Sequence, residues 1–140
     1  MIENNQDLIS VNSDVLSKEI TKVLIEKQGL SIRLFDMRDT EGITDFYINA
    51  TGRSSMHVAS LADDVDELIG LRGRQPLRIE GKRGNAWILV DYGDVIVNVF
   101  DRESRNFYNF DRLLPENAEV DISNLVAEVD KKFKLNKEDI

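Results

Sequence analysis

The chain has 140 residues, a length that suits one domain with a single hydrophobic core. Hydrophobic residues make up 41% and charged residues 31%, and no apolar run approaches the roughly 20 residues of a membrane-spanning helix. The formal net charge is −8, so the chain lacks the dominant Lys/Arg field of nucleic-acid binding, and a basic protein is the better electrostatic partner. The absence of cysteine excludes disulfides, thiolate metal sites and a cysteine nucleophile. The N-terminus lacks the pattern of a secretory signal, so a cytoplasmic protein is expected.

The first third of the sequence predicts a tail, a helix and two strands. Residues 1–12 have no periodicity and are predicted to form a flexible tail. A helix is expected from Ser13, whose side chain can cap it, to about Gly29, which can end it. Its buried stripe has the i, i+4, i+7, i+8 spacing of one helical face and comprises Leu16, Ile20, Val23 and Leu24. Strands are predicted at residues 31–37 and 45–52, on either side of a polar turn.

A second helix is predicted over about residues 54–69, and three strands follow it. The buried face of this helix is expected to contain Val58, Leu61, Ala62, Val65, Leu68 and Ile69. The strands are predicted at residues 77–81, 86–92 and 94–101. Tyr92-Gly93 indicates a hairpin or a tight bend between the last two strands.

The C-terminal part combines an aromatic segment with an amphipathic one. Residues 102–114 are predicted to form a short helix with Phe107, Tyr108 and Phe110, and whether the two phenylalanines belong to the core or to the surface is left open. Beyond Pro115, one helical face can contain Ile122, Leu125, Val126, Val129 and Phe133. The order α-β-β-α-β-β-β-α predicts an α/β fold with a mixed sheet of about five strands flanked by helices. The domain is expected to span residues 13–116, with residues 117–140 as a C-terminal extension.

The sequence offers few groups for catalysis. His57 is the single histidine, so a site with several histidine ligands is excluded, and its place in the first turn of the second predicted helix favours a surface residue. The turn at residues 52–55 resembles an anion-binding turn at a helix N-terminus, but it lacks the glycine patterns of phosphate-binding loops. A positive φ at Gly52 and capping by Ser54 are the preferred explanation.

Two carboxylates, Asp91 and Asp94, leave one enzymatic alternative. In a magnesium-dependent nucleotidyltransferase, a turn such as Gly52–Ser54 precedes two strand carboxylates that hold the ion. Residues three apart on an extended strand point to opposite faces, so these carboxylates converge only if the chain bends at Gly93. No third carboxylate or general base is evident in the sequence. We therefore expect no cofactor, and the enzyme is the alternative reading.

Three segments carry a specific combination of motifs. Residues 45–67 contain D-[FY]-x-I-x-x-T-G-x-S-S, residues 79–101 contain E-G followed by W-[IV]-L-x-D-[YF]-G-D-[VI]-[IV]-V, and residues 105–114 contain R-x-[FY]-Y. Any one motif alone would be weak, but their combination over roughly residues 14–114 resembles the Iojap family, the ribosomal silencing factors.

The resemblance implies an α/β fold related in topology to nucleotidyltransferases but without catalysis. It also implies that the chain binds the large ribosomal subunit through ribosomal protein L-fourteen, at the face that the small subunit joins. Subunit joining would be blocked sterically, which represses translation in starvation or stationary phase, and a role in large-subunit maturation is implied as well. Homodimers occur in the family. The absence of a transit-peptide pattern points to a bacterial, cytoplasmic member.

By position in the motifs, the resemblance assigns partner-facing roles to residues of the predicted hairpin and of the aromatic segment. They are Trp87, Asp91, Tyr92, Gly93, Asp94, Phe107 and Tyr108, with Lys82 and Arg83 at the rim. Aromatic anchors beside acidic groups also suit contact with a basic protein. Asn98 stands where the family usually has His, which removes any role for a strand histidine. Leu114 stands where Trp is frequent, which puts the packing at the end of the last predicted helix in doubt.

Overall fold

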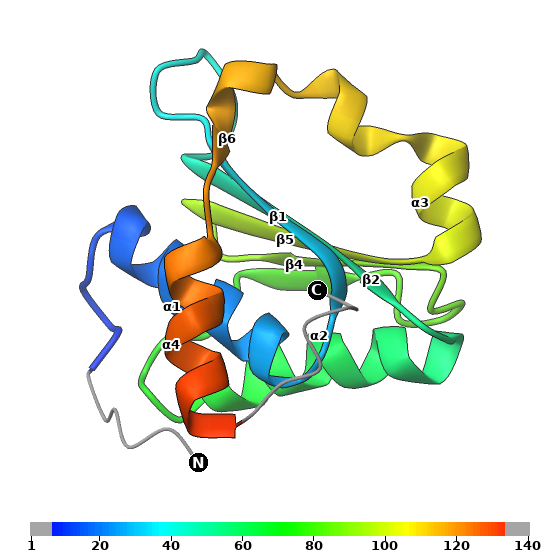
Figure 1. Ribbon diagram of the computed structural model, residues 1–140, viewed down its shortest axis with the longest axis horizontal. Helices are drawn as coiled ribbons and strands as arrows, with labels where there is room; N and C mark the ends of the chain where they lie inside the picture. Colours follow the sequence, from blue (N-terminus) through cyan, green and yellow to red (C-terminus); the bar gives the residue numbers. More distant parts are fainter. Residues whose placement is uncertain (1–6, 134–140) are drawn as a thin grey trace.

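The computed structural model describes residues 7–133, which form a mixed six-stranded sheet with helices on both faces (Figure 1). In chain order the elements are α1 (Ser13–Glu26), β1 (Leu30–Asp36), β2 (Phe46–Gly52), α2 (Ser55–Gly70), β3 (Arg78–Glu80), β4 (Trp87–Asp91), β5 (Val95–Asp101), α3 (Arg102–Tyr108), the 3-10 turns η1 (Phe110–Leu113) and η2 (Glu116–Ala118), β6 (Glu119–Val120) and α4 (Ser123–Phe133). The α/β class is confirmed, and the sheet has six strands rather than five.

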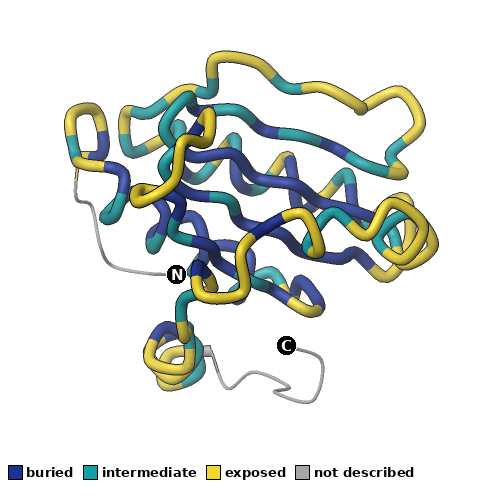
Figure 2. The backbone as a smooth tube through the Cα atoms, turned by 90° about the horizontal axis from the view of Figure 1, so that it is seen from above, coloured by how far each residue is buried: buried dark blue, intermediate teal, exposed yellow. Residues whose placement is uncertain are grey.

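The sheet has the strand order β3-β4-β5-β2-β1-β6. Only β2 and β5 pair in parallel, and every other pair is antiparallel. The parallel pair lies at the centre and is buried on both faces, which explains why β5 reads as a nearly continuous apolar run. Figure 2 shows these central strands in dark blue, with exposed segments around them.

Helices α1 and α2 cover one face of the sheet, and α4 packs against α1 (Figure 1). Segment α3–η1 lies on the other face, where α3 contacts β5 and β2. The main core lies between the sheet and α1 and α2, and it contains almost the whole predicted stripe of each helix. Leu68 is the exception, since it is only partly buried. Within the described residues, no helix is both long enough and apolar enough to cross a membrane.

Both long helices begin at polar caps, as the sequence predicts, but one cap is a different residue. In α1 the N-cap is Asn12, whose side chain accepts a hydrogen bond of 3.0 Å from the Val15 N–H, so the prediction of Ser13 was wrong by one position. Ser13 instead donates a 2.8 Å hydrogen bond to Asp45. In α2 the predicted cap Ser54 is confirmed, because its Oγ accepts from the His57 N–H at 3.1 Å.

Gly52 has a different role from the predicted one. Its φ is not positive. A Cβ atom at this position would lie 2.7 Å from both the backbone N and Cγ2 of Val58, so glycine is needed for the close approach of β2 to α2. His57 in the same turn is partly buried, accepts a 2.9 Å hydrogen bond from the Arg53 N–H at Nδ1, and has Nε2 3.3 Å from the Lys27 carbonyl oxygen. The turn is thus a packed junction between strand and helix.

The ends of the described chain are more integrated than the sequence suggests. Within the predicted N-terminal tail, Leu8 is fully buried in the main core and its N–H donates to the Arg72 carbonyl at 2.7 Å, so a loose tail was wrong at this position. Residues 1–6 lie outside the described part. At the other end, β6 pairs with β1, and α4 buries Leu125 and Val129 in the main core. The side chain of Phe133, placed on the same face by the sequence, lies outside the described residues.

Candidate partner-binding surface

The face of the sheet opposite α1 and α2, which we call the second face, carries the candidate site. Side chains alternate along β4, so Ile88 and Val90 enter the main core while Trp87, Leu89 and Asp91 point to the second face. Trp87 and Asp91 are therefore about 13 Å apart along one row, at two ends of the same strand. The half-buried Leu89 lies between them and links the two parts of the candidate site.

Trp87, Phe107 and Tyr108 form an aromatic patch at the first end of β4. The ring of Tyr108 lies 5.0 Å from Trp87 and 5.0 Å from Phe107, between centroids. Phe107 is 79% exposed and Tyr108 is 54% exposed, whereas Trp87 is half-buried beneath them. The sequence left open whether Phe107 and Phe110 belong to the core or to the surface. Phe107 is a surface residue, whereas Phe110 is partly buried against Trp87 and Tyr47.

A chain of side-chain hydrogen bonds holds Trp87 in place from below. The indole Nε1–H of Trp87 donates to Asn98 at 2.9 Å, Asn98 donates to Asn49 at 3.1 Å, and Asn49 donates to Asp111 at 2.6 Å. Asn98 and Asn49 are almost completely buried. Buried polar groups that are satisfied in this way fix one arrangement, because leaving any of them unpaired is costly. Asn98, which stands where the resemblance leads one to expect histidine, thus orients the tryptophan of the aromatic patch.

At the other end of β4, the two carboxylates bind separate arginines. Asp91 accepts hydrogen bonds from Arg78 Nε at 3.0 Å and from the Gly93 N–H at 2.7 Å. Asp94 accepts from Arg74 at 2.8 Å. Among the residues that the structure describes, no group of three or more acidic or histidine side chains is placed to hold a metal ion. In this conformation each carboxylate is thus engaged by its own arginine.

Tyr92 and Gly93 shape the hairpin between β4 and β5. Gly93 has a φ of +90°, which a residue with a side chain rarely adopts, and the Tyr92 N–H donates to the Val95 carbonyl at 2.9 Å. The predicted hairpin is confirmed. Tyr92 itself is only 3% exposed and belongs to the main core, so its ring is not accessible to a partner in this conformation. Tyr92 continues the alternation of β4, because Ile88 and Val90 also enter the main core, so the period of the strand by itself indicates the inward direction of this side chain.

The two rim candidates lie in the exposed turn between β3 and β4. Lys82 makes an ion pair of 2.8 Å with Asp63 of α2, the helix that covers the opposite face of the sheet. Hydrogen bonding to Asp63 and its charge raise the pKa of Lys82. Arg83 is exposed in the same turn. Lys82 is therefore directed away from the row of Trp87 and Asp91.

Sequence analysis missed two residues of the second face, Tyr47 and Arg78. Tyr47 of β2 is half-buried, and burial together with the charge of Asp91 raises the pKa of its phenol. Arg78 is paired with Asp91 across the β3–β4 ladder. The period-2 alternation of β2 placed Tyr47 opposite the core, so that signal was available in the sequence. No pattern along the chain could place Arg78 beside Asp91, because the contact depends on strand register.

Leu114 stands where the resemblance leads one to expect tryptophan. It is 9% exposed and packs with Phe35, Met37 and Ala118 in a small second core between η1 and β1. The shorter side chain is thus accommodated as a packing residue.

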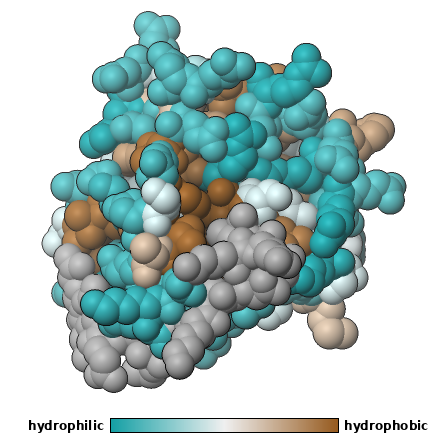
Figure 3. Space-filling model, viewed as in Figure 1, coloured by the Kyte–Doolittle hydropathy of each residue, from teal (hydrophilic) through white to brown (hydrophobic). Residues whose placement is uncertain are grey.

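Figure 3 shows that the side of the molecule seen in Figure 1 is largely hydrophilic at its periphery, with hydrophobic side chains gathered towards its centre.

Comparisons with known proteins agree with the motifs on this surface. The family model described as "Ribosomal silencing factor during starvation" matches residues 10–139. The ribosomal silencing factor RsfS of Zymomonas mobilis is 33% identical over 104 residues, which cover 74% of this chain and 78% of that protein. A mouse protein named for mitochondrial assembly of the ribosomal large subunit is 25% identical over 73 residues, or 50% of this chain and 32% of that protein.

A solved structure has the same fold. The crystal structure of a Chromobacterium violaceum protein superposes with a TM-score of 0.71 at 29% identity, covering 74% of this chain and 87% of that one. The family model spans nearly the whole chain, including β6 and α4, which motif comparison had left outside the recognisable region. On this basis, the chain belongs to the family of ribosomal silencing factors.

Proposed function

We propose that this protein is a non-enzymatic repressor of translation in the bacterial cytoplasm. It binds the large ribosomal subunit through ribosomal protein L-fourteen, occupies space that the small subunit needs, and so prevents subunit joining under starvation or in stationary phase. Family membership is the observation that carries the proposal. The name of the mouse relative supports the choice of the large subunit, and a role in its maturation is compatible with the same contact.

The aromatic patch is the proposed anchor of this contact. Exposed aromatic side chains above a supported tryptophan have the composition of interface hot spots, which bury large side chains in a few central positions. Phe107 and Tyr108 are already ordered by ring contacts with each other and with Trp87, so little side-chain entropy is lost on binding.

The acidic end of β4 is the proposed electrostatic part of the surface. Asp91 and Asp94 are paired with Arg78 and Arg74, and Glu80, which shares Arg78 with Asp91, leaves this end of β4 with an excess of one negative charge. A net charge of −8 on the whole chain favours encounter with a basic ribosomal protein and disfavours direct contact with RNA phosphates. The hairpin therefore contributes chiefly to orientation and association rate, and the aromatic patch to affinity.

The test is co-sedimentation of the purified protein with isolated large subunits, using Phe107→Ala. Because Phe107 is 79% exposed, its removal leaves the fold intact, and we expect the Kd to rise by about thirtyfold, the typical effect of a hot-spot residue. Met56→Ala is the matched control, since Met56 is 80% exposed on α2, against the opposite face. Equal binding of wild type and Phe107→Ala would refute the aromatic anchor.

Two further measurements test the partner and the mechanism. A photo-crosslinking side chain at position 107 should attach to ribosomal protein L-fourteen, and attachment to another protein would refute that assignment. In an order-of-addition experiment, large subunits that receive the protein first and small subunits second should form fewer joined ribosomes than large subunits that receive small subunits first. If bound protein leaves joining unchanged, occlusion is the wrong mechanism.

A further inference from the structure

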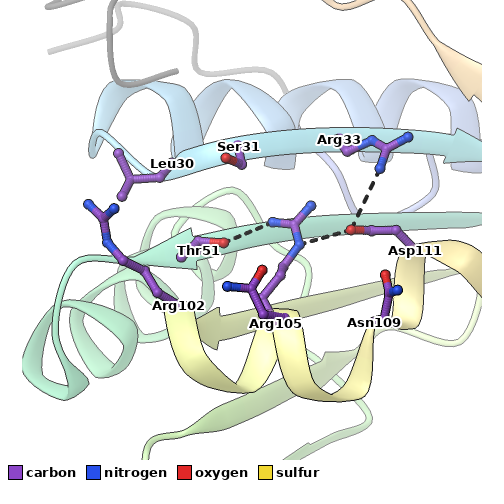
Figure 4. A pocket seen from close by; sticks show the side chains of 9 residues that line it. Leu30, Ser31, Arg33, Thr51, Arg102, Arg105, Asn109 and Asp111 are labelled. Carbon is purple, nitrogen blue, oxygen red and sulfur yellow. Dashed lines mark hydrogen bonds and ion pairs between the residues drawn. The ribbon is translucent and has the colours of Figure 1, made fainter.

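A cavity of about 440 Å³ lies on the second face, between strands β1 and β2 and helix α3. Figure 4 shows side chains from four elements meeting there: Ser31 and Arg33 from β1, Thr51 from β2, Arg102 and Arg105 from α3, and Asp111 from η1. None of these residues belongs to the aromatic patch or to the acidic hairpin.

The backbone is shaped to open this cavity. The β1–β2 register shifts between Leu30 and Arg33, so β1 contains one extra residue there, and Ser31 has a φ of +47°. Asn109, which ends α3 at the other side of the cavity, has a φ of +49°. Bulges and positive φ values at residues other than glycine cost free energy and are found preferentially at binding sites.

Hydrogen-bond donors are in excess in the cavity. Its one carboxylate, Asp111, already accepts from Arg105 Nε at 3.0 Å and from Asn49 at 2.6 Å, and it lies 3.7 Å from Arg33. Arg105 uses a second nitrogen to donate to Thr51 at 3.0 Å, which leaves its third nitrogen available, since a guanidinium has five N–H donors.

Arg102 supplies the charge that is not compensated. Glu119 binds Arg33 through two hydrogen bonds of 3.0 and 2.6 Å, and Asp111 balances Arg105. Arg102 makes no ion pair or hydrogen bond with any side chain that the structure describes. Arg102 and Arg105 are three residues apart on α3 and therefore lie on the same helix face, towards the cavity (Figure 4).

The chemistry of the lining selects a small, very polar anion. Two guanidinium groups on one wall match the oxygens of a phosphate group, and arginine binds phosphate with directed pairs of hydrogen bonds. Among the described residues, Leu30 is the only apolar side chain in the lining, so a nucleobase would find no aromatic or extended apolar surface there. A chain with net charge −8 also repels a polynucleotide more strongly than a small ion.

We propose that this arginine cavity is a binding site for a small phosphate-bearing anion, with Arg102 and Arg105 as its principal ligands. The site is separate from the proposed ribosome contact and can be tested without ribosomes. Asp111 connects the arginine cavity to the aromatic patch, because it lines the cavity and also ends the hydrogen-bond chain that begins at Trp87.

The experiment is a titration of the ¹⁵N-labelled full chain with inorganic phosphate, followed by NMR, at constant pH and constant ionic strength maintained with chloride. Saturable shifts are expected at the backbone amides of Ser31, Thr51, Arg102 and Arg105. Arg102→Gln should weaken phosphate binding by about tenfold, since it removes one charged hydrogen-bonding group. Arg83→Gln removes the same charge from the exposed β3–β4 turn and should leave the Kd unchanged.

Three results would overturn the proposal. The first is the absence of saturable shifts, or equal shifts with chloride alone. The second is an unchanged Kd in Arg102→Gln. The third is a short single-stranded RNA that shifts the same amides more strongly than inorganic phosphate at equal phosphate concentration, which would assign the cavity to a nucleic-acid backbone.

Discussion

Replacing Tyr92 with phenylalanine is expected to stabilise the protein, although the residue lies in one of the three motifs that carry the family resemblance. The side chain is 3% exposed, and within the described residues its hydroxyl has no hydrogen-bond partner. Leaving a buried donor unpaired costs about 1–3 kcal/mol, so we expect Tyr92→Phe to raise the free energy of unfolding by about 1 kcal/mol. Tyr92→Ala should lower it by about 3–5 kcal/mol, because it empties a large core position.

The pH dependence gives a second, sharper expectation. Burial raises the pKa of the Tyr92 phenol above that of the unfolded chain, which is near 10. The folded state therefore keeps the proton while the unfolded state loses it. The contribution of Tyr92 to the free energy of unfolding is therefore retained at pH values below the pKa of the unfolded chain, and it falls as the pH rises above that pKa. At pH 11 the wild type should lose about 1.4 kcal/mol relative to Tyr92→Phe, beyond the difference at pH 8.

Urea denaturation of both proteins at pH 8 and pH 11 measures this double difference. Other groups that titrate, Tyr47 among them, are common to both proteins and cancel. A difference in unfolding free energy that stays the same at the two pH values would mean that the Tyr92 hydroxyl reaches solvent in the folded state. Destabilisation by Tyr92→Phe at pH 8 would mean that the hydroxyl has a partner, and either result would refute the reasoning.

Two further substitutions test the junctions that position the site. Gly52→Ala should lower the free energy of unfolding by about 1–3 kcal/mol in the same denaturation assay, because the added methyl group overpacks against Val58. Gly84→Ala is the control and should have little effect, since an added Cβ there meets no atom within 4 Å. Equal effects of the two substitutions would contradict the close contact at Gly52. Asn98→Ala should cost about 2–4 kcal/mol, because it leaves the Trp87 indole and a buried amide oxygen unpaired. Since Trp87 is the single tryptophan, its fluorescence reports both unfolding and the change in the environment of the indole, and an unchanged spectrum and stability would contradict the hydrogen-bond chain.

The separation of the two parts of the proposed surface has a consequence for recognition. The aromatic patch and the acidic hairpin lie at opposite ends of β4, joined by Leu89, so a partner that contacts both must cover the length of the strand. Such a contact fixes the orientation of the protein on its partner, which is what steric occlusion requires. An aromatic anchor alone would permit rotation.

The sequence by itself determined the two long helices, five of the six strands and the family. Apolar spacing located the buried faces of α1 and α2, and Tyr92-Gly93 marked the hairpin, because these features depend on neighbours within a few positions along the chain. Capping was predictable for the same reason, to within one residue in α1.

Only the tertiary structure decided which motif residues are accessible and which elements complete the fold. Phe107 is exposed and Phe110 is partly buried, although both lie in one aromatic segment, because their directions depend on how α3 and η1 pack against the sheet. Strand register brought Arg78 to Asp91, and the arginine cavity required β1, β2 and α3 together. Contacts between residues distant in sequence carry no local periodicity, and so the pairing of β6 with β1 and the burial of Leu8 became visible only in the folded chain.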